Sequence, residues 1–152
     1  AKDRAELISQ FELEGFYVNV LSVRRTLVEK MLGVIKDSYN ENPVGRLSNR
    51  IRHLYDICLI LRHKEYKAFV QSAEFISLCK VCIADEEAVF IKSPNIFEKS
   101  LSDAPLFSEF SNWRPALEAT YNNDFAQLVF GEMSEMDEIV NTIRFLKENL
   151  GK

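Results

Sequence analysis

The sequence predicts a mainly α-helical, bundle-like protein with a short β-hairpin or sheet-edge element at its N-terminus. Apolar residues recur at spacings of three and four along most of the chain, and they alternate with polar residues only near its start. A content of 47% apolar and 28% charged residues is typical of a globular protein. We therefore divide the 152 residues into a β element over 1–21 and a helical domain over 22–152.

The β element rests on the alternation at 11–14, the turn former Gly15 and the apolar run at 16–21. An isolated hairpin is marginally stable in water. We therefore expect these strands to belong to a sheet whose other strands precede this chain.

The helical spacing begins after Ser22, a good N-cap residue, and predicts a helix over 23–37. Turn-forming residues from Asp37 to Gly45 then predict an exposed, mobile loop. A second helix is expected over 46–62, followed by two more over 64–72 and 73–89.

An irregular stretch is expected from Ser93 to Pro105, and mixed helical character over 113–129. Ser134 precedes Asp137 by three residues, which is the spacing of a capping box. The last helix should begin there, with one apolar face formed by Met136, Ile139, Val140, Ile143, Leu146 and Leu150.

The composition indicates the compartment. The longest purely apolar run, residues 57–61, is far too short to span a bilayer, and no leader-like segment opens the chain. Three cysteines are an odd number, which favours reduced thiols over a disulfide framework. We expect a bacterial cytoplasmic protein without membrane contact.

Three motifs that could carry chemistry have simpler structural interpretations. Cys79 and Cys82 have the C-x-x-C spacing of metal or redox sites, but they continue an apolar helix face. Residues 85–87 (DEE) point in different directions on a helix and favour a solvated face. Residues 113–115 (WRP) suggest a helix start with proline in the first turn.

The charge is unevenly distributed. Residues 22–67 carry 10 lysines and arginines against 5 carboxylates, whereas residues 68–152 carry 7 against 14. A phosphate-bearing ligand or RNA should therefore bind to the middle block, unless the excess is a chance feature of solvated helix faces.

A polar stripe runs along the expected second helix within this block. It contains Asn49, Arg52, His53, Asp56 and His63, opposite the apolar face. Lys30 lies at the margin of the buried face of the first helix. Spacing alone also allows ordinary surface groups, with Arg52 and Asp56 forming an i,i+4 pair.

Residues 19–32, which contain Arg25-Thr26-x-x-Glu29-Lys30, and residues 52–57 (RHLYDI) resemble the AbiEii/AbiGii family of nucleotidyltransferase toxins. In that family a strand leads into an R-T-x-x-E-K helix, and an R-[HD]-x-x-D-[IL] helix follows a variable loop. The tail from Thr120-Tyr121 to Phe130-Gly131-Glu132 is also similar to the family's C-terminal pattern.

The resemblance implies a bacterial toxin of an abortive-infection or toxin–antitoxin system. Such proteins use Mg²⁺ and a nucleoside triphosphate to transfer a nucleotide onto an acceptor, which is RNA or tRNA in some relatives. It assigns catalytic roles to Lys30 and Asp56, and nucleotide binding to Lys30 and Arg52. A cognate antitoxin protein is the expected partner.

One part of the family pattern is missing. Family members carry, upstream, a Gly-[Ser/Thr] turn followed by Asp-x-[Asp/Glu], the groups that hold Mg²⁺ and phosphates. The letters Asp85-x-Glu87 occur, but downstream and on an expected helix. We therefore expect no metal site here, and a C-terminal part that is inactive alone.

Two hypotheses remain open. The chain is either the helical arm of a nucleotidyltransferase or a non-catalytic module that binds an antitoxin. The first predicts Lys30 and Asp56 within about 10 Å of each other across two antiparallel helices. The second predicts independent surface groups, with Lys30 directed to bulk water.

Overall fold

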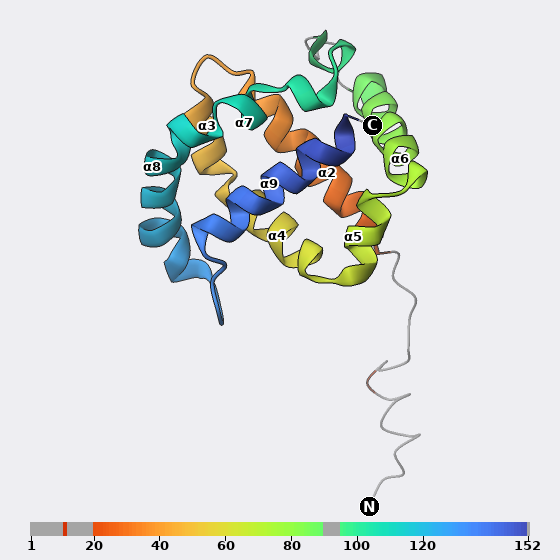
Figure 1. The fold of residues 1–152 in the computed structure, drawn as a ribbon. Coiled ribbons are helices and arrows are strands. Elements are labelled where there is room, and N and C mark those ends of the chain that lie inside the picture. The colour runs from red at the N-terminus through yellow and green to blue at the C-terminus, as the bar shows by residue number, and fades with distance from the viewer. Residues whose placement is uncertain (1–10, 12–19, 90–94, 152) are drawn as a thin grey trace, which may run out of the picture.

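A computed structural model describes residues 11, 20–89 and 95–151 (Figure 1). These residues form helices and turns and contain no strand. The helical part of the predicted fold class is therefore confirmed, whereas the β element over 1–21 is wrong: Val20 and Leu21 are exposed and irregular. Residues 12–19, which carry most of the expected hairpin, lie outside the described residues. A short alternating pattern does not specify a sheet without partner strands.

The first described helix, α2 (Val23–Ser38), begins where the sequence predicts. The Ser22 hydroxyl oxygen accepts a hydrogen bond from the Arg25 backbone N–H at 3.1 Å. The predicted exposed loop over 37–45 is wrong at both ends. Asp37 is buried in the last turn of α2, and the next helix, α3 (Pro43–Asn49), already begins at Pro43.

The predicted helix over 46–62 is divided. Arg50, with φ −111° and ψ 20°, separates α3 from α4 (Ile51–Arg62). Two helices then follow close to the predicted bounds, α5 (Lys64–Val70) and α6 (Ala73–Val89).

The C-terminal half contains shorter elements before a long final helix. They are η1 (Asn95–Glu98), η2 (Leu101–Asp103), α7 (Pro105–Ser108), α8 (Phe110–Thr120), the π-helical turn η3 (Tyr121–Phe125), η4 (Ala126–Leu128) and α9 (Met136–Leu150).

Two predicted helix starts in this half are wrong. Helix α8 begins at Phe110 and contains Pro115 in its interior. The N-cap of α9 is Glu135 and makes no side-chain cap bond, while Ser134 is buried and accepts a hydrogen bond from Arg62 at 3.1 Å. The Ser134 hydroxyl therefore makes a tertiary hydrogen bond with Arg62, and not the local bond of a capping box.

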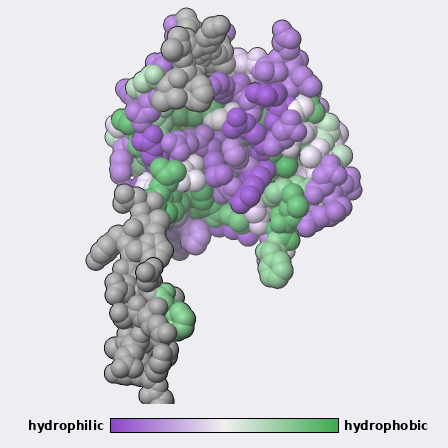
Figure 2. Space-filling view, turned by 180° about the vertical axis from the view of Figure 1, so that it is seen from behind, coloured by the Kyte–Doolittle hydropathy of each residue, from purple (hydrophilic) through white to green (hydrophobic). Residues whose placement is uncertain are grey.

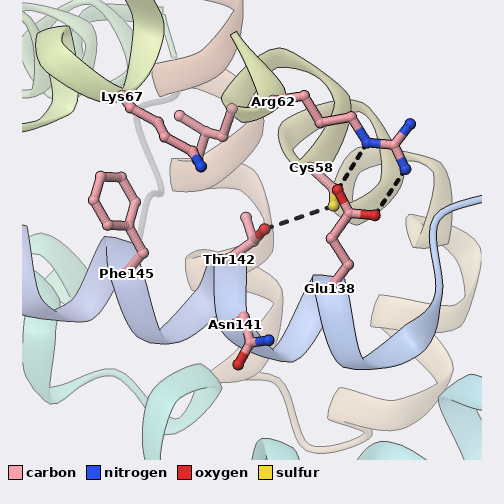
Figure 3. A pocket seen from close by; sticks show the side chains of 8 residues that line it. Cys58, Arg62, Lys67, Glu138, Asn141, Thr142 and Phe145 are labelled. Carbon is pink, nitrogen blue, oxygen red and sulfur yellow. Dashed lines mark hydrogen bonds and ion pairs between the residues drawn. The ribbon is translucent and has the colours of Figure 1, made fainter. Parts of the chain in front are cut away.

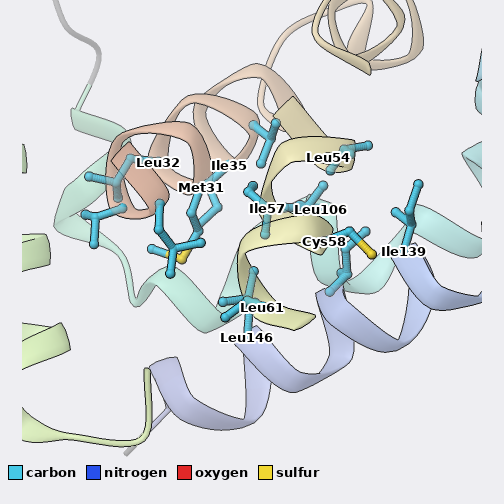
Figure 4. Packing of buried hydrophobic residues seen from close by; sticks show 14 of the residues in the cluster. Met31, Leu32, Ile35, Leu54, Ile57, Cys58, Leu61, Leu106, Ile139 and Leu146 are labelled. Carbon is cyan, nitrogen blue, oxygen red and sulfur yellow. The ribbon is translucent and has the colours of Figure 1, made fainter. Parts of the chain in front are cut away.

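The helices pack around one core. Helix α2 packs against α4 and α6, α4 also packs against α9, and α3 packs against α8 (Figure 1). Figure 4 shows apolar side chains of α2, α4, α7 and α9 meeting between these helices, among them Met31, Ile35, Leu54, Ile57, Leu106, Ile139 and Leu146. Because α2 and α4 pack against each other in this core, the positions of the polar side chains at the rim of their interface are fixed relative to one another. None of the described helices combines the length and apolar character needed to cross a membrane.

Candidate functional site at the rim of α2 and α4

Lys30 on α2 and Asp56 on α4 form an ion pair at the rim of the helix interface. The ammonium Nζ lies 2.8 Å from the carboxylate Oδ2, and the two side chains are 22% and 23% exposed. The predicted juxtaposition is confirmed, and Lys30 does not point to bulk water. Partial burial strengthens such a pair relative to one on an open surface, while an incoming anion can still reach it.

Arg52 joins the same carboxylate from one turn earlier on α4. Its Nε lies 3.6 Å from Asp56 Oδ2, and its side chain is 77% exposed. The i,i+4 pair that spacing alone suggested is therefore also present. The three groups together carry a net positive charge, with Arg52 extending into solvent, which is suited to attracting phosphate oxygens.

A second group of polar residues holds the start of α4 against the end of α2. The buried Asp37 carboxylate lies 2.6 Å from Arg50 Nε and 3.7 Å from Arg46 Nε. Arg50 passes close to Gly33, where an added Cβ would come within 3.2 Å of its Nη1. Sequence reasoning missed both Asp37 and Arg50. The available signal was a carboxylate in the last turn of a helix with an apolar face, followed in the sequence by Arg46 and Arg50.

His53 lies between these two polar groups. Its Nε2 is 3.4 Å from Arg50 Nη1, and its buried Nδ1 has no hydrogen-bond partner among the described residues. Burial, followed by the nearby cations Lys30 and Arg50, lowers the pKa of His53. His53 therefore favours the neutral form, which makes it a poor phosphate ligand. His63, expected in the same polar stripe, instead caps the end of α4 and stacks edge-on against Tyr66.

The family model described as nucleotidyl transferase AbiEii toxin, Type IV TA system, matches residues 3–142. The chain belongs to this family. No curated protein and no solved structure shows a significant match. The resemblance seen in the sequence is thus confirmed at the level of the family, a nucleotidyltransferase-like toxin of a toxin–antitoxin system. The motif residues of this AbiEii chain, from Arg25 to Lys30 and from Arg52 to Asp56, lie on the two helices that form the rim.

The Mg²⁺ ion that the AbiEii family implies does not fit the residues described. No group of three histidine, cysteine or carboxylate side chains within 20–89 and 95–151 could hold a metal ion. Asp56 shares one carboxylate oxygen with two cations, and a Mg²⁺ ligand set needs oxygens that such pairs do not occupy.

The other candidate motifs have structural roles. Cys79 and Cys82 are buried, and burial is the main cause that raises the pKa of Cys79 to about 12. The expectation of a solvated face for residues 85–87 holds for Asp85 and Glu87, which are exposed, whereas Glu86 is partly buried. Asp85 lies 2.6 Å from Arg25, and Glu86 pairs with Lys36, so both tie α6 to α2.

Sequence analysis did not predict a small pocket between α4, α5 and α9 (Figure 3). It measures about 250 Å³. Arg62 closes one side by donating two hydrogen bonds of 2.7 Å to Glu138, and these bonds lower the pKa of the Glu138 carboxyl. Thr142 donates to the Cys58 sulfur at 3.6 Å. The Arg62–Glu138 and Thr142–Cys58 contacts join α4 to α9 along this pocket, so its walls contribute to helix packing.

Proposed function

We propose that the chain is the helical arm of an AbiEii-type nucleotidyltransferase in which Lys30 and Arg52 bind the triphosphate and Asp56 positions the lysine. The observation that carries this proposal is the 2.8 Å pair of Lys30 and Asp56, with Arg52 bound to the same carboxylate oxygen. A binding module of purely structural design would not need two cations gathered on one carboxylate at an accessible rim.

The chemistry of nucleotide transfer explains these residue types. An acceptor hydroxyl attacks the α-phosphorus, a new P–O bond forms, and the bond to pyrophosphate breaks. Negative charge develops on the leaving group, where the Lys30 ammonium and the Arg52 guanidinium can neutralise it. The Asp56 carboxylate can fix the direction of the ammonium or accept a hydrogen bond from the acceptor hydroxyl.

We further propose that the Mg²⁺ ligands of the complete site come from carboxylates outside the described residues, on a segment preceding them as in other family members. Without such carboxylates the triphosphate cannot be aligned for in-line attack. The 152-residue chain alone should accordingly transfer no labelled nucleotide to RNA, although its cations can bind phosphate.

The test is a titration of the purified chain with inorganic tripolyphosphate and with nucleoside triphosphates. Lys30→Ala should weaken binding at least about tenfold, which corresponds to about 1.4 kcal/mol. Asp56→Asn should bind as tightly as the wild type or more tightly, because it removes the carboxylate that competes with phosphate. Arg144→Ala is the matched control, since this exposed arginine on α9 bonds only to Asn141 among the interactions seen. Unchanged affinity in Lys30→Ala would refute the phosphate role.

The second candidate function, a module that binds an antitoxin protein, is favoured by one observation. Leu128, the last residue of η4, is 79% exposed, and Phe130, on the segment that joins η4 to α9, is fully exposed. This segment projects from the body of the molecule in Figure 1, and Figure 2 shows a hydrophobic projection at the lower edge. Under this hypothesis Phe130→Ala should abolish binding to the antitoxin encoded with the protein, while the affinity for tripolyphosphate stays unchanged.

A further inference from the structure

A hollow of about 490 Å³ opens beside Arg52, between the α3–α4 junction and the turns η3 and η4. One wall contributes Asn49 and Arg52, and the facing wall contributes Thr120, Asp124, Phe125 and Leu128. A volume of this size is within the range of sites that bind small organic molecules.

Arg52 connects this hollow to the ion pair described above. Its side chain lines the hollow, and its Nε lies 3.6 Å from Asp56 Oδ2, which in turn lies 2.8 Å from Lys30 Nζ. Arg52 therefore lies between the hollow and the Lys30–Asp56 pair. A ligand with phosphates at Lys30 would extend its remaining part into this space.

The apolar part of the facing wall is suited to a flat ring. Phe125 is buried and held edge-on by Tyr55, with ring centroids 5.3 Å apart, so its position is well defined. Leu128 stands 79% exposed at the mouth, so its apolar surface is available to a ligand. A planar base that covers Leu128 would bury this surface.

The polar part is suited to a sugar and to the edge of a base. The exposed Asp124 carboxylate only accepts hydrogen bonds at neutral pH, which matches ribose hydroxyl donors. The Asn49 amide both donates and accepts, as a base edge requires. Thr120 donates to the Ser48 hydroxyl at 3.4 Å, a contact that joins α8 to α3 beside the hollow.

We propose that this hollow binds the base and ribose of a nucleotide whose phosphates reach Arg52 and Lys30. The inference rests on the proposed function, because that function places the phosphates. The nucleoside can belong to the incoming triphosphate or to the 3′-terminal nucleotide of an RNA acceptor, since both present the same base and sugar. The experiment below separates these two sources.

The test is a two-dimensional NMR titration of the chain with three probes. They are inorganic tripolyphosphate, the four nucleoside triphosphates, and a trinucleotide RNA with a free 3′-hydroxyl. Tripolyphosphate should shift the amides around Lys30 and Asp56 only. A triphosphate that enters the hollow should also shift those of Asn49, Asp124 and Leu128. Such shifts with the triphosphates alone would identify the incoming nucleotide, and shifts with the trinucleotide alone would identify the acceptor.

Variants make the assignment quantitative. Leu128→Ala should raise the Kd of the bound nucleotide about fivefold, the effect of losing most of one apolar contact, and leave the Kd of tripolyphosphate unchanged. Val81→Ala on α6 is the matched control, because Val81 is another exposed apolar residue far along the chain from the hollow. Since Leu128 is exposed, its truncation should not affect folding.

The outcomes separate the two proposals. If nucleotides shift only the amides around Lys30 and Asp56, or if Leu128→Ala binds them as the wild type does, the hollow is not the nucleoside site and the proposed function stands. If tripolyphosphate shifts no amide near Lys30, the proposed function fails. The nucleoside assignment fails with it, because that assignment needs the phosphates at Arg52 and Lys30.

Discussion

The Nε of Arg50 lies 2.6 Å from Oδ2 of the buried Asp37, so the break between α3 and α4 is bound to the last turn of α2. This contact sets how α4 starts and therefore where its motif residues lie. Arg50→Ala would leave a buried carboxylate with only Arg46, at 3.7 Å, as a cationic partner. We expect the free energy of unfolding to fall by about 2 kcal/mol, as measured by urea denaturation. Arg46→Ala, which removes the longer and more exposed contact, should cost less than about 1 kcal/mol. Equal losses in both variants would contradict this assignment.

A pH dependence follows from His53. Burial and the cations Lys30 and Arg50 lower its pKa in the folded protein, against the smaller opposing effect of Asp56 and Asp37. Below the ordinary histidine pKa of about 6.5 the unfolded chain binds a proton that the folded chain resists, so stability should fall as the pH decreases from 7.5 to 5.5. Urea midpoints for the wild type and His53→Gln measure this contribution. The variant should show the smaller decrease, whereas His63→Gln, at an exposed position, should behave as the wild type. A steeper decrease of stability with falling pH in His53→Gln than in the wild type would contradict this assignment.

Tyr121 offers a test of the C-terminal packing. Its buried hydroxyl donates a 2.8 Å hydrogen bond to the Ser134 carbonyl, just before α9 begins. Tyr121→Phe should reduce the free energy of unfolding by about 1 kcal/mol, because the carbonyl loses its partner in a buried setting. Burial is also the main cause that raises the pKa of Tyr121 to about 12. Burial also raises the pKa of Tyr39. Spectrophotometric titration should therefore show tyrosines that ionise above the ordinary value, and this late component should lose one tyrosine in Tyr121→Phe.

The cysteines should be unreactive in the native protein. All three are buried and free, and burial raises the pKa of each thiol, that of Cys79 to about 12. Only the thiolate attacks a disulfide reagent, so Ellman's reagent at pH 8 should label the native chain slowly and the urea-unfolded chain at three sites. Rapid native labelling at Cys79 or Cys82 would instead indicate a redox pair.

Local patterns predicted the parts of the fold that local physics determines. The Ser22 cap and the apolar spacing after it located the start of α2, and the last apolar face located α9. Helical spacing also placed Lys30 and Asp56 near each other, although α3 separates their two helices in the chain.

Errors arose where a distant residue decides the local structure. Arg50, at the helix break, forms an ion pair with Asp37. The Ser134 hydroxyl, which the capping box would use, instead accepts a hydrogen bond from Arg62, 72 residues earlier in the chain. Neither partner can be inferred from the residues adjacent in the sequence. The hollow beside Arg52 combines two walls that are more than 60 residues apart in the chain, so spacing alone could not reveal it.

The Arg62–Glu138 pair joins positions 76 residues apart. During synthesis α2 and α4 leave the ribosome before α9, although all three helices contribute to the same core. The opposite face of α4, including Cys58 and Leu61, stays uncovered until α9 emerges. A toxin of this architecture therefore completes the core around α4 only after α9 has been translated.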